Sequence, residues 1–162
     1  MLRYLREDRK TGDQDFIDMM HDFVRTYMHQ NASTESFQSV VEKHLKQGID
    51  LDHNGRMDWF FREWVYGTEI PSYRMEYSLS PEADGKVLLT AKVTQSGVSP
   101  DFVMAVPVYL EFDGKMVHLG SVALKGNMTS DEVKVRLPKK PKKVQLNANY
   151  KVLAAEAVAK EI

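Results

Sequence analysis

The sequence has no cysteine among its 162 residues. This absence excludes disulfide frameworks, thiolate zinc sites and cysteine nucleophiles. The sequence also has no apolar run near the roughly 20 residues that a membrane-spanning helix needs, and the charged segment 1–8 lacks the apolar core of a signal peptide. We therefore expect a soluble chain without membrane insertion, and the sequence leaves its compartment open.

An excess of charge of one sign is also missing. The chain has 22 Lys and Arg residues against 23 Asp and Glu residues, which gives a net charge of −1. A balanced charge provides no overall attraction to nucleic acids or anionic membranes. We therefore expect no nucleic-acid partner.

Contiguous catalytic motifs are absent as well. None of the five histidines belongs to an H-E-x-x-H sequence, and there is no G-x-S-x-G sequence or glycine-rich phosphate loop. His21 and His44 fall on or beside apolar helix faces, which favours packing roles over metal ligation. The sequence thus predicts no catalytic residue and no bound cofactor for this chain itself.

The spacing of apolar residues is helical up to about residue 67. It predicts a helix over 13–30 with Asp13 as its N-cap, a second from Ser33 or Thr34 to Gly48, and a short third helix ended by Gly67 and Pro71. The expected buried positions of the first two are Phe16, Met20, Phe23 and Tyr27, then Phe37, Val40, Val41, His44 and Leu45. Leu2 and Leu5 resemble the tail of a further helix, so we expect 1–70 to be part of a larger helical region.

From about residue 73 to 150 the apolar residues alternate, which predicts about seven short strands. Asp113-Gly114 is a hairpin turn, Gly120 indicates a bulge, and Pro107 suggests an edge or bulged strand. The expected fold class is α+β, an N-terminal helical segment followed by an antiparallel immunoglobulin-like β-sandwich at 71–150. Residues 151–162 are rich in Ala, Glu and Lys, and we expect a helical or frayed C-terminal tail there.

One segment has the spacing of a calcium-binding loop. Residues 50–58 follow the first nine positions of an EF-hand loop, with glycine at the sixth position and with Arg56 at the seventh, whose ligand is a backbone carbonyl. The candidate calcium ligands are Asp50, Asp52, Asn54, Arg56 and Asp58. The twelfth position, which needs a bidentate Glu, is Phe61, so we expect weak calcium binding, or else a polar connector whose Asn54-Gly55 forms a turn.

Two other clusters have a structural and a functional interpretation. Residues 139–143 read Lys-Lys-Pro-Lys-Lys, which we expect to be a solvated loop between strands, the alternative being a contact for an acidic partner. A dense aromatic group has helical spacing and indicates a core or an interdomain contact rather than a ligand-stacking platform. The residues that we expect to make this interdomain packing are Trp59, Phe60, Phe61 and Trp64.

Residues 59–71 read Trp-Phe-Phe-Arg-Glu-Trp-Val-Tyr-Gly-Thr-Glu-Ile-Pro. This run resembles a segment of the membrane alanyl aminopeptidase family of zinc metallopeptidases, in which it joins the helices after the catalytic domain to a β domain. The flanking segments are similar to that family in the expected order: 1–3 to the end of a helix after the catalytic core, 16–27 and 33–37 to the next two helices, and 137–147 to the final strands of the β domain.

The resemblance implies a non-catalytic C-terminal region that packs beside its own catalytic domain, with zinc only in that missing domain. The family's H-E-x-x-H and G-x-M-E-N motifs have no counterpart here, so no catalytic residue carries over. Two alternatives remain open at this point: a calcium-dependent binding module that uses the Asp50–Asp58 loop, and an immunoglobulin-like module that recognises protein or carbohydrate.

Overall fold

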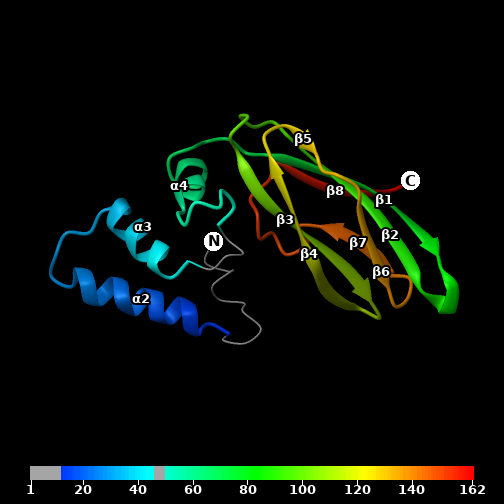
Figure 1. Cartoon of the computed structure of the whole chain (residues 1–162), viewed down its shortest axis with the longest axis horizontal. Coiled ribbons are helices and arrows are strands. Elements are labelled where there is room, and N and C mark those ends of the chain that lie inside the picture. The colour runs from blue at the N-terminus through cyan, green and yellow to red at the C-terminus, as the bar shows by residue number, and fades with distance from the viewer. Residues whose placement is uncertain (1–11, 46–49) are drawn as a thin grey trace. The chain divides into compact units, whose positions relative to one another are not determined.

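A computed structural model describes residues 12–45 and 50–162 of the chain (Figure 1). The chain divides between Thr68 and Glu69 into a helical unit and a β unit. The described part thus has an α+β architecture, with three α-helices and mostly antiparallel strands in two sheets. The segment 1–3, the leucines at 2 and 5, and the helix stop expected at Gly48 lie outside the described residues.

The helical unit contains α2 (Gln14–Tyr27), α3 (Thr34–Lys43) and α4 (Asp58–Trp64). Of the two predicted starts, Ser33 and Thr34, it is Ser33 that caps α3, because its hydroxyl accepts a hydrogen bond from the backbone N–H of Ser36 at 3.2 Å. Asp13 occupies the N-cap position of α2 but makes no capping bond with its side chain. The residues that are buried on α2 and α3 are Met19, Val40 and Val41.

The predicted faces of α2 and α3 are only partly confirmed. Phe16, Met20, Phe23 and Tyr27 are half-buried, whereas Met19, which was not among the predicted positions, is fully buried. The rings of Phe23 and Phe37 meet edge to face at 5.2 Å, which packs α2 against α3.

The β unit has a five-stranded sheet and a three-stranded sheet. The first contains β1 (Ser72–Pro81), β2 (Val87–Ser96), β5 (Met128–Thr129), β6 (Val133–Leu137) and β8 (Glu156–Glu161), and a 3₁₀ turn η2 (Ala83–Gly85) joins β1 to β2. The second contains β3 (Val103–Phe112), β4 (Lys115–Lys125) and β7 (Lys143–Leu146). The strand orders are β5-β2-β1-β8, with β6 also paired to β2, and β4-β3-β7.

The alternation along β1 and β2 is as predicted, because a strand places successive side chains on opposite faces of its sheet. The alternate residues that are buried are Tyr73, Met75 and Tyr77 on β1 and Val87, Leu89, Ala91 and Val93 on β2. The strands pair antiparallel from Ser72↔Ser96 to Pro81↔Val87. The register brings the two apolar faces together on one side of the sheet.

The hairpin and bulge predictions are confirmed on β3 and β4. Asp113 and Gly114 both have positive φ, at 49° and 77°, as a tight hairpin between strands requires. The ladder pairs Val108 with Gly120 and then Tyr109 with His118, so Leu119 is the additional residue beside Gly120.

We predicted that Pro107 lies on an edge or bulged strand. It lies on the central strand of its sheet, so the prediction of an edge strand is wrong, whereas a bulge does interrupt the β3–β4 ladder directly after Val108. The carbonyl of Pro107 accepts a hydrogen bond from Asn147 N at 2.8 Å, which shows that its backbone polar groups point toward β7. The β3–β7 ladder runs from Glu111↔Lys143 to Val108↔Leu146 and does not include Pro107. The missing N–H of Pro107 therefore falls where that ladder has already ended.

The C-terminal segment differs most from its prediction. We expected strands up to about residue 150 and a helical or frayed tail at 151–162, but β7 ends at Leu146 and β8 forms a further strand. β8 pairs in parallel with β1, from Ser72↔Glu156 to Tyr77↔Glu161. Helix-favouring Ala, Glu and Lys residues here take the strand conformation because the edge of β1 offers a complete ladder of hydrogen bonds.

Candidate functional site

The calcium-like loop lies between α3 and α4 and folds around Asp50. The two carboxylate oxygens of Asp50 accept hydrogen bonds from the backbone N–H groups of Asn54 at 3.1 Å and Gly55 at 2.8 Å. Gly55 has a φ of 73°, and His53 also lies in the left-handed region with a φ of 53°. The sharp turn that an EF-hand loop needs at its sixth position is therefore present.

The other acidic side chains of the loop face arginines. Arg56 Nε lies 3.1 Å from Asp58 Oδ2, and Arg62 Nη2 lies 4.0 Å from Asp52 Oδ2. Gln38 donates a hydrogen bond from Nε2 to the remaining oxygen of Asp58 at 2.9 Å. Two carboxylates of the loop therefore contact arginines and Gln38, whereas metal ligands would converge on one point.

The start of α4 is fixed to α3 by Glu42. Its carboxylate accepts a hydrogen bond from the backbone N–H of Met57 at 2.9 Å and another from Gln38 Nε2 at 2.8 Å. A carboxylate at a helix N-terminus satisfies an unpaired N–H and is stabilised by the helix dipole. Glu42, which the sequence analysis did not single out, therefore organises the polar contacts between these helices.

Within residues 12–45 and 50–162, no group of three or more His, Asp or Glu side chains has the arrangement of a metal site. The candidate ligand Asn54 accepts a hydrogen bond from the N–H of Arg56 at 2.8 Å, so its oxygen supports the turn. Phe61, at the twelfth loop position, is buried with 3% of its surface exposed. As folded, Asp50 and Asn54 support the turn of this loop through hydrogen bonds, and Asp52 and Asp58 form ion pairs with arginines.

The aromatic helix α4 is part of the core of the helical unit. Trp59 and Phe61 are buried, while Phe60 and Trp64 are half-buried. The ring of Phe60 meets those of Trp59 and Phe61 edge to face at 5.7 and 5.6 Å. These contacts show the core role of the cluster, and the predicted packing against another domain remains a prediction.

Two polar contacts join distant parts of the helical unit. His44 Nε2 donates to Asp22 Oδ2 at 3.1 Å, and this hydrogen bond lowers the pKa of Asp22. The Tyr66 hydroxyl donates to Glu35 Oε1 at 2.7 Å. Hydrogen bonds from Ser33 and then Tyr66 lower the pKa of Glu35 from 4.5 to about 2. His44 is therefore a structural histidine that joins α2 to α3, as the sequence favoured.

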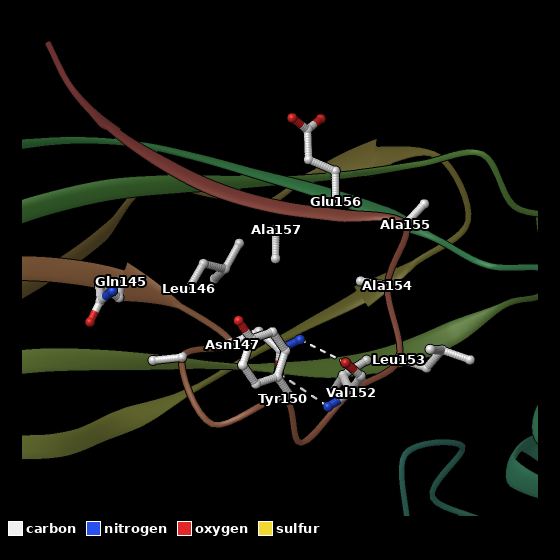
Figure 2. Close-up of a pocket in the computed structure, with 11 residues that line it drawn as sticks. Gln145, Leu146, Asn147, Tyr150, Val152, Leu153, Ala154, Ala155, Glu156 and Ala157 are labelled. Atoms are coloured by element: carbon white, nitrogen blue, oxygen red, sulfur yellow. Dashed lines mark hydrogen bonds between the residues drawn. The ribbon is translucent and has the colours of Figure 1, made fainter.

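The β unit contains a cleft that the sequence analysis missed. It has a volume of about 420 Å³ and lies between the end of β7, the loop 147–155 and the start of β8. Asn147 holds the loop: its side chain accepts from Val152 N at 3.1 Å and donates to Val152 O at 2.6 Å, as the dashed lines in Figure 2 show. Tyr150 and Leu153 lie at this cleft with 90% and 61% of their surfaces exposed.

A second cleft of about 300 Å³ lies farther along the same two strands, and both clefts are lined by Gln145, Leu146 and Ala157. Together they form one groove, which we call the β7–β8 groove. In the sequence its only signal was the apolar alternation of Val144 and Leu146, since residues 151–162 have a helix-favouring composition. The pairing of β8 with β1, which creates the second wall, depends on contacts between distant residues.

No family model matches the chain, and no curated protein matches it. In the described residues, no helix is both long and apolar enough to cross a membrane.

Proposed function

We propose that the chain is the non-catalytic C-terminal region of a zinc aminopeptidase of the membrane alanyl aminopeptidase family. The observation that carries this proposal is the position of the boundary between the two units. It falls between Thr68 and Glu69, inside the run 59–71 whose resemblance implies a junction between helices and a β domain. Helices, aromatic segment and β unit follow one another in the order that the resemblance requires.

The junction has local features that suit this role. α4 supplies the aromatic residues of the run, and Gly67 follows it where no side chain fits, since a Cβ there would lie 2.6 Å from the carbonyl oxygen of Glu63. Pro71 is buried next to the first residue of β1. In the proposed parent protein, Trp59, Phe60, Phe61 and Trp64 pack at the interface between domains, with the half-buried Phe60 and Trp64 available for added contacts.

The strand pairing supports an immunoglobulin-like sandwich as the finer fold of the β unit. The pairings β1–β2–β6 and β4–β3–β7 match those of strands A–B–E and C′–C–F in immunoglobulin domains. β8 departs from that pattern, because it pairs with β1 instead of β7. We therefore place the β unit with immunoglobulin-like sandwiches whose last strand has moved to the opposite sheet.

In this proposal the partner is the parent's own catalytic domain, which holds the zinc ion. The chain itself contributes no H-E-x-x-H motif. Its contribution is to support the catalytic domain and to shape access to the active site.

The native size of the gene product tests the proposal. An antibody against this chain should detect, in the source cells, a protein several times larger than 18.6 kDa. That larger protein should release N-terminal amino acids from an aminoacyl reporter, and a chelator should abolish the activity. Chelator-sensitive turnover by the purified 162-residue chain, or a native band at 18.6 kDa, would contradict the proposal.

One observation favours a second candidate function, calcium-dependent binding. Asp50 and Gly55 form the sharp turn of an EF-hand loop. Calcium would then have to draw Asp58 away from Arg56. We therefore expect weak binding, with a dissociation constant of about 10⁻⁴–10⁻³ M or larger, as in weak extracellular sites.

Trp59 adjoins this loop, so its emission serves to test the candidate. Under this candidate function, millimolar calcium shifts the emission of the chain, Asp50→Ala abolishes the shift, and the matched variant Asp84→Ala, in the β unit, retains it. An unchanged emission and melting temperature in calcium leave the loop as a structural connector.

A further inference from the structure

Strand β8 has one unpaired edge. It lies at the end of the order β5-β2-β1-β8, and no strand of the described chain pairs with its other side. In a parallel ladder, alternate residues direct both backbone polar groups to the same neighbour. Ile162 N donates to Tyr77 O at 2.9 Å, so with this register Val158 and Lys160 also face β1, and the intervening Ala157 and Ala159 direct their backbone groups outward.

The β7–β8 groove runs beside this edge. On the side of β8 it is lined by the small residues Ala157 and Ala159, and on the side of β7 by Val144 and Leu146. Figure 2 shows Ala157 and Leu146 directed toward each other across the groove, whereas Glu156 points away from it. Short side chains on one wall leave room for the side chains of an added segment, and an extended segment presents every second side chain to one face.

The two ends of the groove differ in chemistry. One end has the exposed Tyr150 and Leu153, together with the buried Val152. The other end has Lys142 and Lys143. Lys142 lies 3.9 Å from Glu111, and Lys143 has no ion pair among the described residues. The groove is thus apolar at one end and cationic at the other.

The surrounding segment strengthens this charge. Residues 133–162 contain eight Lys and Arg residues against two Glu residues, within a chain whose net charge is −1. Two copies of the chain joined through this surface would bring like charges together, which disfavours self-pairing. An acidic segment has the complementary charge.

Tyr150 is exposed on a strained backbone. Its φ is 50°, in the left-handed region that disfavours bulky side chains, and it is 90% exposed. The two hydrogen bonds between Asn147 and Val152 hold the loop in this form. Strained residues that are fixed by their surroundings occur preferentially at ligand-contacting positions.

We propose that the β7–β8 groove binds an extended acidic segment of another protein, which adds as a strand to the free edge of β8. Its backbone pairs with Ala157 and Ala159, its carboxylates face Lys142 and Lys143, and an apolar residue at one end contacts Tyr150 and Leu153. This is the β-augmentation mode of peptide recognition. The inference goes beyond the proposed function and stands independently of it.

Binding of labelled synthetic peptides to the 162-residue chain tests the proposal by fluorescence anisotropy. The probes alternate valine and glutamate and have a leucine at either the first or the last position, with both ends blocked. We expect saturable binding of one of the two, weakened by added salt. Methylation of alternate backbone nitrogens of that probe should weaken it at least tenfold, which is about 1.4 kcal/mol, because methylation removes donors to β8 and keeps every charge.

Two sets of variants locate the site. Lys142→Glu with Lys143→Glu should weaken binding about tenfold, whereas the matched pair Lys115→Glu with Lys125→Glu, at the ends of β4, should leave it unchanged. Tyr150→Gly should weaken binding severalfold while it preserves or raises the melting temperature, since glycine relieves the positive φ.

Three results would overturn the proposal. The first is the absence of saturable binding of both probes, and the second is equal binding of the methylated probe, which would show charge attraction alone. The third is a dimer in sedimentation equilibrium that Ala159→Pro dissociates, which would make a second copy the occupant of the edge. Ala159→Pro removes an outward N–H and leaves the pairing with β1 intact, so the fold is retained in that comparison.

Discussion

At the scale of single residues, two glycines in turns have similar backbone conformations but different room for a side chain. Gly114 and Gly126 both have positive φ, at 77° and 62°. A Cβ at Gly114 would meet nothing within 4 Å, whereas a Cβ at Gly126 would lie 2.9 Å from the carbonyl oxygen of Pro100. Gly126 N also donates to Phe102 O at 2.7 Å, which fixes the approach of the two segments.

We predict that Gly126→Ala destabilises the β unit by about 2–4 kcal/mol and Gly114→Ala by about 1 kcal/mol. The first change adds a steric clash to the cost of the left-handed conformation, and the second adds only the conformational cost. Urea unfolding followed by far-ultraviolet circular dichroism at the β-sheet band measures both. Equal losses would show that Pro100 moves aside without cost.

Glu35 and Tyr66 predict a pH dependence of the helical unit. The folded pKa of Glu35 is about 2, against an ordinary value of 4.5. A lowered pKa means that the unfolded chain binds the proton more tightly, so the stabilisation is present above pH 4.5 and is lost as the pH falls toward 2. Glu35→Gln should therefore destabilise the unit at pH 6 and have no effect near pH 2.

Tryptophan emission reports this change, because Trp59 and Trp64 both lie in the helical unit. Tyr66→Phe, which removes the donor to Glu35, is the matched control. It should reduce, in part, the difference in unfolding free energy between pH 6 and pH 2. A destabilisation by Glu35→Gln that is the same at both pH values would contradict the assignment.

At the scale of elements, β8 shows the limits of local sequence patterns. The composition of residues 151–162 favours a helix, yet the parallel ladder with β1 makes them a strand. The elements read correctly were those with strong periodicity or specific turn residues, such as β1, β2 and the Asp113-Gly114 hairpin. Pairing over more than 70 residues of sequence leaves no such local signal, because it depends on loop closure and on the free edge of β1.

Hydrogen exchange distinguishes the strand from a helical or frayed tail. We predict slow exchange for the backbone amides of Ala155, Val158 and Lys160, which face β1, and fast exchange for those of Ala157 and Ala159. Amide exchange measured by NMR resolves these positions. Uniformly fast exchange would indicate a frayed tail, and uniformly slow exchange would indicate a helix or a strand paired on both sides.

At the scale of the whole molecule, the core is unevenly divided. Six of the buried apolar residues of the described chain lie in the helical unit: Met19, Val40, Val41, Met57, Trp59 and Phe61. The remainder lie in the β unit, where both sheets contribute. Burial of apolar surface is the main favourable term in folding, so the β unit has the larger reserve of stability.

We predict that residues 69–162, expressed alone, unfold cooperatively and keep the β-sheet circular dichroism of the full chain. Residues 1–68 alone should melt at a lower temperature and with a broader transition, since their core is small. Calorimetry of the two pieces and of the whole chain gives the comparison. A β unit that fails to fold by itself would show that its stability depends on the helical unit.

The sequence by itself determined the local elements of this protein: the cap at Ser33, the turn at Gly55, the aromatic helix α4 and the alternation along β1 and β2. Each depends on the conformational preference or the periodicity of neighbouring residues. The tertiary structure alone decided the contact of Glu42 with Met57, the hydrogen bond from Gln38 to Asp58, and the β7–β8 groove. Those features arise where segments far apart in sequence meet, and their energies depend on distances and burial that no local pattern encodes.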